Sequence, residues 1–236
     1  MKLLTFAFVC VLLLSLYSCS DTTSPSNLSK VKIEMGFDGY PSVSAINKTT
    51  SNINALTVDS IFVQKVRILI KQIKFHVDND SAEFNDDNYK AGPFVLTFDY
   101  GALTPFTLSS NITPGLFDKI KVEFHRFSSS ELAVYANNSV FKDFATNDRY
   151  SVIIEGKLFT NGKSENFTFN SNMTANLEIE LEDHIKLEAD KLSTFKLLIQ
   201  PSLLFKKGLT LLDPRETKNQ NDLDNAIKSM LKMKLK

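Results

Sequence analysis

The residue with the clearest chemistry in this sequence is Cys19, which closes the tetrapeptide Leu16-Tyr17-Ser18-Cys19. Lys2 and the apolar run Leu3–Leu16 precede it. A run of about fourteen residues is shorter than the ~20 that a membrane-spanning helix needs, so the segment has the features of a secretory signal. A cysteine thiolate is the side chain that can be converted to a lipid thioether. Several acyl chains would then anchor a protein stably where one would not.

The tetrapeptide resembles the bacterial lipobox, in which an apolar residue and two tolerant positions precede a cysteine. The resemblance implies that residues 1–18 are removed as a lipoprotein signal peptide and that Cys19, acylated with fatty acids such as palmitate, becomes the first mature residue. The alternative interpretation is a plain secretory signal with a chance cysteine. Residues 19–29 are rich in Ser, Thr and Asp and predict a flexible tether. We therefore expect a protein anchored by its lipid to a bacterial membrane of the cell envelope, at the outer membrane.

An acidic segment follows, in which several carboxylates lie close together in sequence. Hard cations such as Ca²⁺ need several oxygen ligands, so this segment is a candidate metal site. The spacing is not that of an EF-hand, because the glycine and glutamate of that loop are missing, and a solvated hairpin loop is the simpler interpretation. The candidate ligands are Asp78, Asp80, Asp86 and Asp87.

No other residues have the spacing of a catalytic or metal centre. The histidines are far apart in sequence, and His76 and His125 share strand parity with polar residues, which predicts exposed positions. The sequence has no nucleophile elbow and no phosphate-binding loop. We expect no enzyme and no cofactor. The histidines are His76, His125 and His184.

Composition and aromatic residues direct the functional hypotheses. Lys plus Arg and Asp plus Glu both number 27, so no basic excess is present to attract nucleic acid. The leading hypothesis is a ligand-binding or adhesion-type module for glycans. Loop residues such as Tyr40, Tyr89 or Tyr135 would form its stacking platform. The absence of Trp weakens this hypothesis. The alternative is a structural or assembly subunit of an envelope complex, which would dock an edge strand or a C-terminal helix on a partner protein.

Hydrophobic periodicity predicts an all-β domain over residues 30–212, an antiparallel β-sandwich of about eight to nine strands. Residues 59–77 alternate in two different phases, which predicts a β-bulge near Lys71-Gln72. Asn161-Gly162 predicts a type I′ hairpin turn. Residues 132–136 and 140–144 are interpreted as two short strands.

Residues 213–236 predict a loop and an amphipathic helix of about fifteen residues that needs a docking surface. Asn221 has the position of an N-cap. The helix would dock either on the sheet of its own domain or on a membrane or partner. Its apolar stripe is Leu223, Ile227, Met230 and Leu231.

Three segments also resemble an uncharacterised family of bacterial lipoproteins with a prealbumin-like (transthyretin-like) sandwich. They are Ile112–Val122 with its Pro-Gly turn, Phe94–Asp99, and Lys196–Pro201. The resemblance covers roughly residues 31–205. It implies a fold and an envelope location, and it implies no activity.

Overall fold

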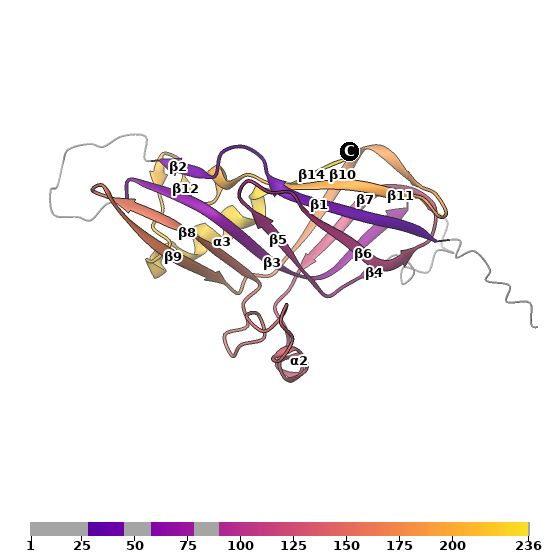
Figure 1. Cartoon of the computed structure of the whole chain (residues 1–236), viewed down its shortest axis with the longest axis horizontal. Helices are drawn as coiled ribbons and strands as arrows, with labels where there is room; N and C mark the ends of the chain where they lie inside the picture. Colours follow the sequence, from indigo (N-terminus) through magenta and orange to yellow (C-terminus); the bar gives the residue numbers. More distant parts are fainter. Residues whose placement is uncertain (1–27, 45–57, 78–89, 236) are drawn as a thin grey trace, which may run out of the picture.

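The structure is a computed structural model that describes residues 28–44, 58–77 and 90–235. Strands dominate these residues and form two main sheets packed face to face, which confirms the predicted all-β sandwich (Figure 1). Within these ranges no helix has the length and apolar content to cross a membrane. The expected signal peptide, Cys19 and most of the tether lie outside the described residues.

The smaller sheet has four strands in the order β14-β11-β1-β6. The pair β1–β11 is parallel, an exception within the predicted antiparallel sandwich. The first and the last long strands of the domain meet here, and strands without a short connecting turn are free to pair in either direction. The strands are β1 (Ser29–Phe37), β6 (Thr104–Ile112), β11 (Leu192–Ile199) and β14 (Leu231–Leu235).

The larger sheet is organised around β3 (Ser60–Val77), the longest strand described. One side of β3 pairs first with β8 and then with β7, and the other side pairs with β2, β5 and β4. The outer strands β10 and β9 complete the sheet. Its other strands are β2 (Ser42–Ser44), β4 (Lys90–Ala91), β5 (Phe94–Asp99), β7 (Gly115–Phe124), β8 (Val152–Thr160), β9 (Lys163–Ser171) and β10 (Ala175–Leu187).

Two β-bulges divide β3. Its pairing register shifts between Val63 and Lys65 against β8, and between Ile70 and Gln72 against β7. The second shift confirms the predicted bulge at Lys71-Gln72. Each extra residue reverses which parity faces the core, and the buried residues change accordingly along the strand. These buried residues are Ile61 and Val63, then Val66, Ile68 and Ile70, then Ile73 and Phe75.

The core lies between the two sheets and is filled by aliphatic and Phe side chains. Phe75 on β3 and Phe195 on β11 meet across the sandwich with ring centroids 6.0 Å apart. Phe94 on β5 and Phe106 on β6 stack at 4.7 Å. These contacts join the sheets, because apolar faces of both would otherwise be exposed to water.

Residues 125–150 leave the larger sheet between β7 and β8 and form a separate projection, which we call the flap (Figure 1). It contains the helix α2 (Ser129–Tyr135) followed by turns through residue 148, so the two short strands predicted at 132–136 and 140–144 are wrong. The local signal for a helix was present: Ser128 and Glu131 have capping-box spacing, and the Glu131 carboxylate accepts a hydrogen bond from the Ser128 N–H at 2.8 Å.

The C-terminal region differs from the prediction at both ends. The helix α3 (Gln220–Met230) follows the 3-10 turn η3 (Thr217–Asn219), so Asn221 lies inside the helix and is not its N-cap. The helix ends at Met230, and residues 231–235 form β14 against β11. The alternation of Leu, Lys, Met, Lys and Leu in this segment is a strand period that the helical interpretation overlooked.

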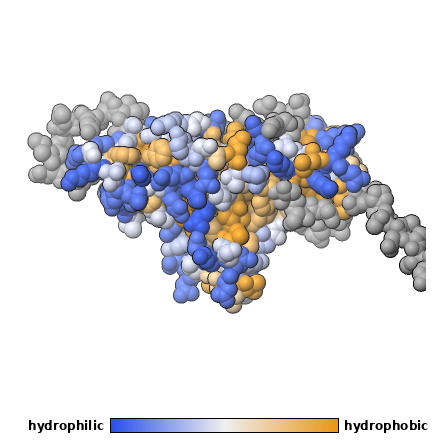
Figure 2. Space-filling model, in the orientation of Figure 1, coloured by the Kyte–Doolittle hydropathy of each residue, from blue (hydrophilic) through white to orange (hydrophobic). Residues whose placement is uncertain are grey.

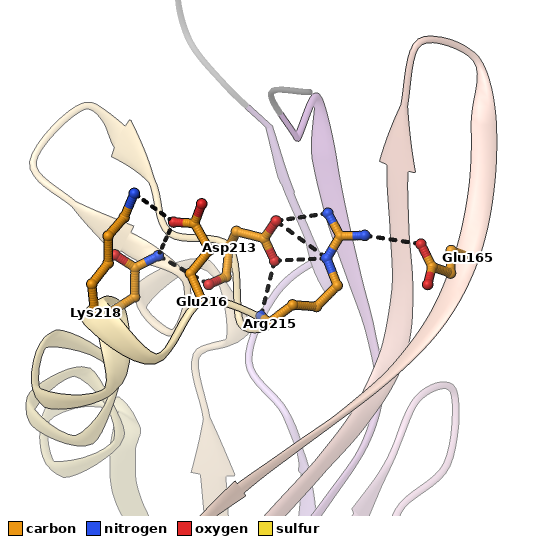
Figure 3. A network of polar contacts seen from close by, with 6 residues as sticks. Glu165, Asp213, Arg215, Glu216 and Lys218 are labelled. Atoms are coloured by element: carbon orange, nitrogen blue, oxygen red, sulfur yellow. Dashed lines mark hydrogen bonds and ion pairs between the residues drawn. The ribbon is translucent and has the colours of Figure 1, made fainter. Parts of the chain in front are cut away.

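A polar network fixes the loop before α3 (Figure 3). The Arg215 guanidinium donates to Asp213 on its own loop and to Glu165 on β9, with the Arg215–Glu165 contact at 2.9 Å. The buried Asn219 amide donates to the Asp213 carbonyl at 2.9 Å. The loop therefore starts α3 in a fixed place. Shorter elements nearby are η2 (Pro201–Leu203), β12 (Lys206–Lys207) and β13 (Thr210–Leu211).

The Asn161-Gly162 hairpin is confirmed. Both residues have positive φ, at 50° and 76°, as a type I′ turn requires, and the flanking residues Thr160 and Lys163 pair. A strand that the sequence did not reveal is β6, which contains Pro105. Proline lacks a backbone N–H, and it is tolerated here because β6 is an edge strand of its sheet.

Candidate functional site

Three aromatic rings from separate segments form an exposed cluster, which we call the aromatic patch. Tyr40 lies between β1 and β2, Phe62 lies on β3, and Tyr100 follows β5. The Tyr40–Tyr100 centroids are 6.2 Å apart with the rings nearly perpendicular, and Phe62 lies 5.0 Å from Tyr100 and 6.3 Å from Tyr40. Tyr40 is 67% exposed and Tyr100 is 47% exposed. Edge-to-face packing holds the rings in place while leaving tyrosine surface open to solvent.

The patch can bind through ring faces and hydroxyl groups together. Each tyrosine presents an apolar ring and a phenolic group that donates and accepts hydrogen bonds. Among the residues with described placement, neither phenolic hydroxyl has a hydrogen-bond partner. A sugar ring needs the same combination, an apolar C–H face to stack and hydroxyls to bond.

The sequence identified only one member of this patch. Tyr40 is in it, whereas Tyr89 lies outside the described residues. Tyr135 is half-buried in the flap, where its ring stacks on Phe127 at 4.4 Å, so it does not form a platform. Tyr100 was missed, although its place directly after a strand and before Gly101 is typical of an exposed turn.

The other predicted site residues are placed as follows. Cys19 and the acidic residues Asp78, Asp80, Asp86 and Asp87 lie outside the described residues. His76 and His125 are exposed, as expected. Across the described ranges no group of three or more His, Cys, Asp or Glu side chains is arranged to hold a metal ion.

The apolar stripe of α3 is buried in the protein's own core. Leu223 is 2% exposed, and Ile227 and Met230 are fully buried. Of the two docking surfaces considered for this helix, its own domain is therefore the one that these three side chains occupy. Leu231 is in β14 and pairs with Ile199 through the backbone.

The flap is attached to the outer face of the larger sheet by a second apolar cluster and one arginine. Phe127 and Phe144 of the flap are buried together with Leu69 of β3. Arg67 of β3 donates to Asp143 of the flap at 2.6 Å and to Glu155 of β8 at 2.9 Å. Burial alone would lower the pKa of Arg67, but these two carboxylates raise it. The flap is therefore held to the strand by both packing and charge.

A pocket of about 220 Å³ lies beside the base of the flap, at the bulge of β3, and we call it the bulge pocket. It forms where β7 ends at Phe124, β3 bulges at Lys71 and the β4–β5 connection passes at Gly92. Its buried lining is apolar and includes Leu69, Ala91 and Phe127. Figure 2 shows a hydrophobic area between the body and the projecting flap. The exposed lining residues Lys71 and His125 place polar groups at the mouth.

The acidic groups near this pocket are already engaged. The Glu131 carboxylate accepts hydrogen bonds from the Ser128 hydroxyl at 2.6 Å and from the Ser128 N–H, and these lower the pKa of Glu131. Burial alone would raise the pKa of Glu123, but hydrogen bonds from Lys74 and Gln72 lower it. Lys71 and Arg126 form no ion pair in the described part of the chain.

We expect the start of α2 to loosen in acid as Glu131 is protonated. Its pKa in the folded protein lies below the ordinary value of 4.5 because Ser128 donates to the carboxylate, with the nearby charges of Lys71 and His125 adding to the effect. The stabilisation is therefore complete above the unfolded-state pKa and is lost as the pH falls through the lower folded value. The amide resonance of Ser128 should titrate below pH 4.5. The Glu131→Gln variant should lack this step, and a Ser128 midpoint above 4.5 would contradict the assignment.

No family model, no curated protein and no solved structure matches this chain. The resemblance to the prealbumin-like lipoproteins therefore stays a prediction.

Proposed function

We propose that this protein is a lipid-anchored β-sandwich of the bacterial cell envelope that binds carbohydrate through the aromatic patch. The observation that carries the proposal is the pair of exposed tyrosines, Tyr40 and Tyr100, fixed 6.2 Å apart against Phe62. A binding role fits this patch better than catalysis, because the patch offers rings and hydroxyls and no acid–base pair.

The position of the patch supports recognition of a chain-like or surface-bound ligand. Tyr40 and Tyr100 are exposed and lie in connections between strands. Loops held by a rigid sheet are frequent sites of binding. Ordered rings also lose little conformational entropy on binding, because tyrosine has only two side-chain torsions.

Affinity electrophoresis tests the carbohydrate proposal. The protein would be run in gels that contain xylan, mixed-linkage β-glucan, mannan or starch, and we expect at least one polysaccharide to retard it. Tyr40→Ala and Tyr100→Ala should each weaken the retardation by up to about tenfold, as the loss of one aromatic contact predicts. Leu209→Ala is the matched control, because Leu209 is equally exposed, at 66%, on a different hairpin. Equal migration in every gel would contradict the proposal.

Membrane anchoring is tested separately with Cys19→Ala. If Cys19 carries the lipid, the wild-type protein sediments with membranes and the variant is released. Protease added to intact cells then shows on which side of the outer membrane the domain lies. A Cys19→Ala protein that remains in the membrane fraction would contradict lipid anchoring.

The second candidate function is assembly with a partner protein. Because the apolar stripe of α3 is buried, the partner would dock on an edge strand. The strand β14 is at one edge of the smaller sheet, and none of the described strands pairs with its outer side. Exposed edges can accept a strand from another protein. Deletion of residues 231–236 separates the candidates, because it would abolish a strand-mediated complex and leave polysaccharide retardation unchanged.

A further inference from the structure

We infer that the bulge pocket is a second binding site, which takes a small organic anion with an apolar body, such as an aromatic carboxylate. The pocket is separate from the aromatic patch: none of its lining residues belongs to that cluster. The inference therefore does not rest on carbohydrate binding.

The strand arrangement creates the hollow. Two strands separate at this point, because β7 ends opposite Ile70 and the flap begins. The backbone is nevertheless tightly fixed on the opposite wall: a Cβ added at Gly92 would lie 2.1 Å from the Lys71 carbonyl oxygen. A wall built by such close backbone contact cannot collapse easily into the space beside it. The hollow is therefore a consequence of the bulged backbone of β3. Such β-bulges are frequent next to functional sites.

The lining of the pocket suits a ligand with an apolar body. The buried part of the lining is apolar, with Leu69 and Phe127 at 0% and 3% exposure, and the rest of the lining is polar. Pockets of this kind bind the apolar part of a ligand, and a few placed polar groups fix its orientation. The volume of about 220 Å³ suits a ring or a short hydrocarbon chain rather than a polymer.

The charges at the pocket favour an anionic ligand. Arg126 is half-buried and Lys71 is exposed, and neither has a carboxylate partner within ion-pair distance in the described residues. Glu131 also lines the pocket, and its carboxylate, which accepts hydrogen bonds from Ser128, keeps its negative charge close to Lys71. A planar guanidinium pairs best with a carboxylate or phosphate, through two parallel hydrogen bonds. The lining thus carries two positive side chains and one carboxylate, which leaves a net positive charge to attract an anion.

His125 adds a polar group of fixed orientation at this mouth. Its Nδ1 lies 2.6 Å from the Arg126 carbonyl oxygen, so Nδ1–H donates to that oxygen. The ring is held, and its Nε2 is left for a ligand or water.

The test is an NMR titration of the ¹⁵N-labelled protein with benzoate. Benzyl alcohol, which lacks the negative charge, and acetate, which lacks the ring, are titrated as comparison probes. We expect benzoate to shift the amides of Gly92, Arg126 and Phe127 in a saturable way. Benzyl alcohol and acetate should bind at least about tenfold more weakly, because one lacks the charge and the other the ring. Equal binding of benzoate and benzyl alcohol would overturn the inference, and so would shifts that do not saturate or that lie away from the pocket.

Variants of the basic side chains show which of them binds the benzoate carboxylate. Arg126→Gln should weaken benzoate binding about tenfold, whereas Arg149→Gln, which removes a flap arginine outside the pocket, should leave it unchanged. If Arg126→Gln fails to fold, Lys71→Gln decides, because the Lys71 side chain is exposed and its loss leaves the core intact. Unchanged benzoate affinity in the folded charge variants would overturn the inference. Tyr40→Ala should have no effect on this titration.

Discussion

Replacing Ile227 with alanine is expected to lower the free energy of unfolding by about 2–5 kcal/mol, the usual cost of truncating a fully buried aliphatic side chain. Ile227 is 0% exposed and belongs to the main core cluster, together with Leu223 and Met230. The helix is also tied to the sandwich by polar contacts: the Gln200 N–H donates to the Met230 carbonyl at 2.9 Å, and the Ser171 hydroxyl donates to Asp224 at 2.6 Å. The Ile227→Ala variant therefore contains a cavity, because these contacts hold α3 and the sandwich in place and prevent them from moving together to fill it.

Urea unfolding followed by circular dichroism measures this effect. Lys228→Ala is the control, because Lys228 is exposed on the opposite face of the same helix and should change stability by less than about 0.5 kcal/mol. A loss below about 1 kcal/mol for Ile227→Ala would mean that α3 does not pack into the core. The helix stripe would then again be available to an external partner.

Replacing Gly156 with alanine is expected to cost about 1–3 kcal/mol or more, although alanine normally stabilises a strand relative to glycine. Gly156 lies on β8, and a Cβ there would be 2.2 Å from the Phe62 carbonyl oxygen and 2.8 Å from the Phe167 ring. The oxygen belongs to the backbone of β3, so the clash cannot be relieved by a side-chain rotation. The strand that carries Phe62 of the aromatic patch would have to move.

Gly115→Ala is the matched control. Its added Cβ would meet the Phe117 ring at 3.4 Å, which is ordinary contact, and Gly115 also lies on a strand. This variant should be neutral or more stable by up to about 1 kcal/mol, the entropic advantage of alanine over glycine. The melting temperature should therefore fall for Gly156→Ala and stay the same or rise for Gly115→Ala. Similar values for both would contradict the close strand contact at Gly156.

Features that depend on a few neighbouring residues were predictable when the stretch was long or the residue types were distinctive. The bulge at Lys71-Gln72 was predictable because a two-residue period can change phase only through an extra residue, and both phases are visible within β3. The Asn161-Gly162 turn was predictable because few residue pairs accept positive φ twice. By contrast, the short apolar segments of the flap have too few residues to separate a helical period from a strand period. The Ser128-Glu131 capping pair was the better guide there.

The candidate sites were less predictable than the fold. Tyr40, Phe62 and Tyr100 come from three separate segments, and no spacing in the sequence indicates that their rings meet. The bulge pocket likewise combines β3, the β4–β5 connection and the base of the flap. Arg126 has no distinctive sequence context. It gains significance only through its place in the lining of that pocket.

The sequence by itself determined where most of the long strands, the β3 bulge and the Asn161-Gly162 hairpin lie, because these depend on side-chain alternation and backbone preferences over a few neighbouring residues. The tertiary structure alone decided that β1 pairs in parallel with β11 and that residues 231–235 add a strand. It also decided that α3 fills the core, and which aromatic and charged side chains meet. The physical reason is that contacts between distant segments depend on how two sheets bury their apolar faces against each other. That is a property of the whole packed chain, and no short stretch of residues carries it.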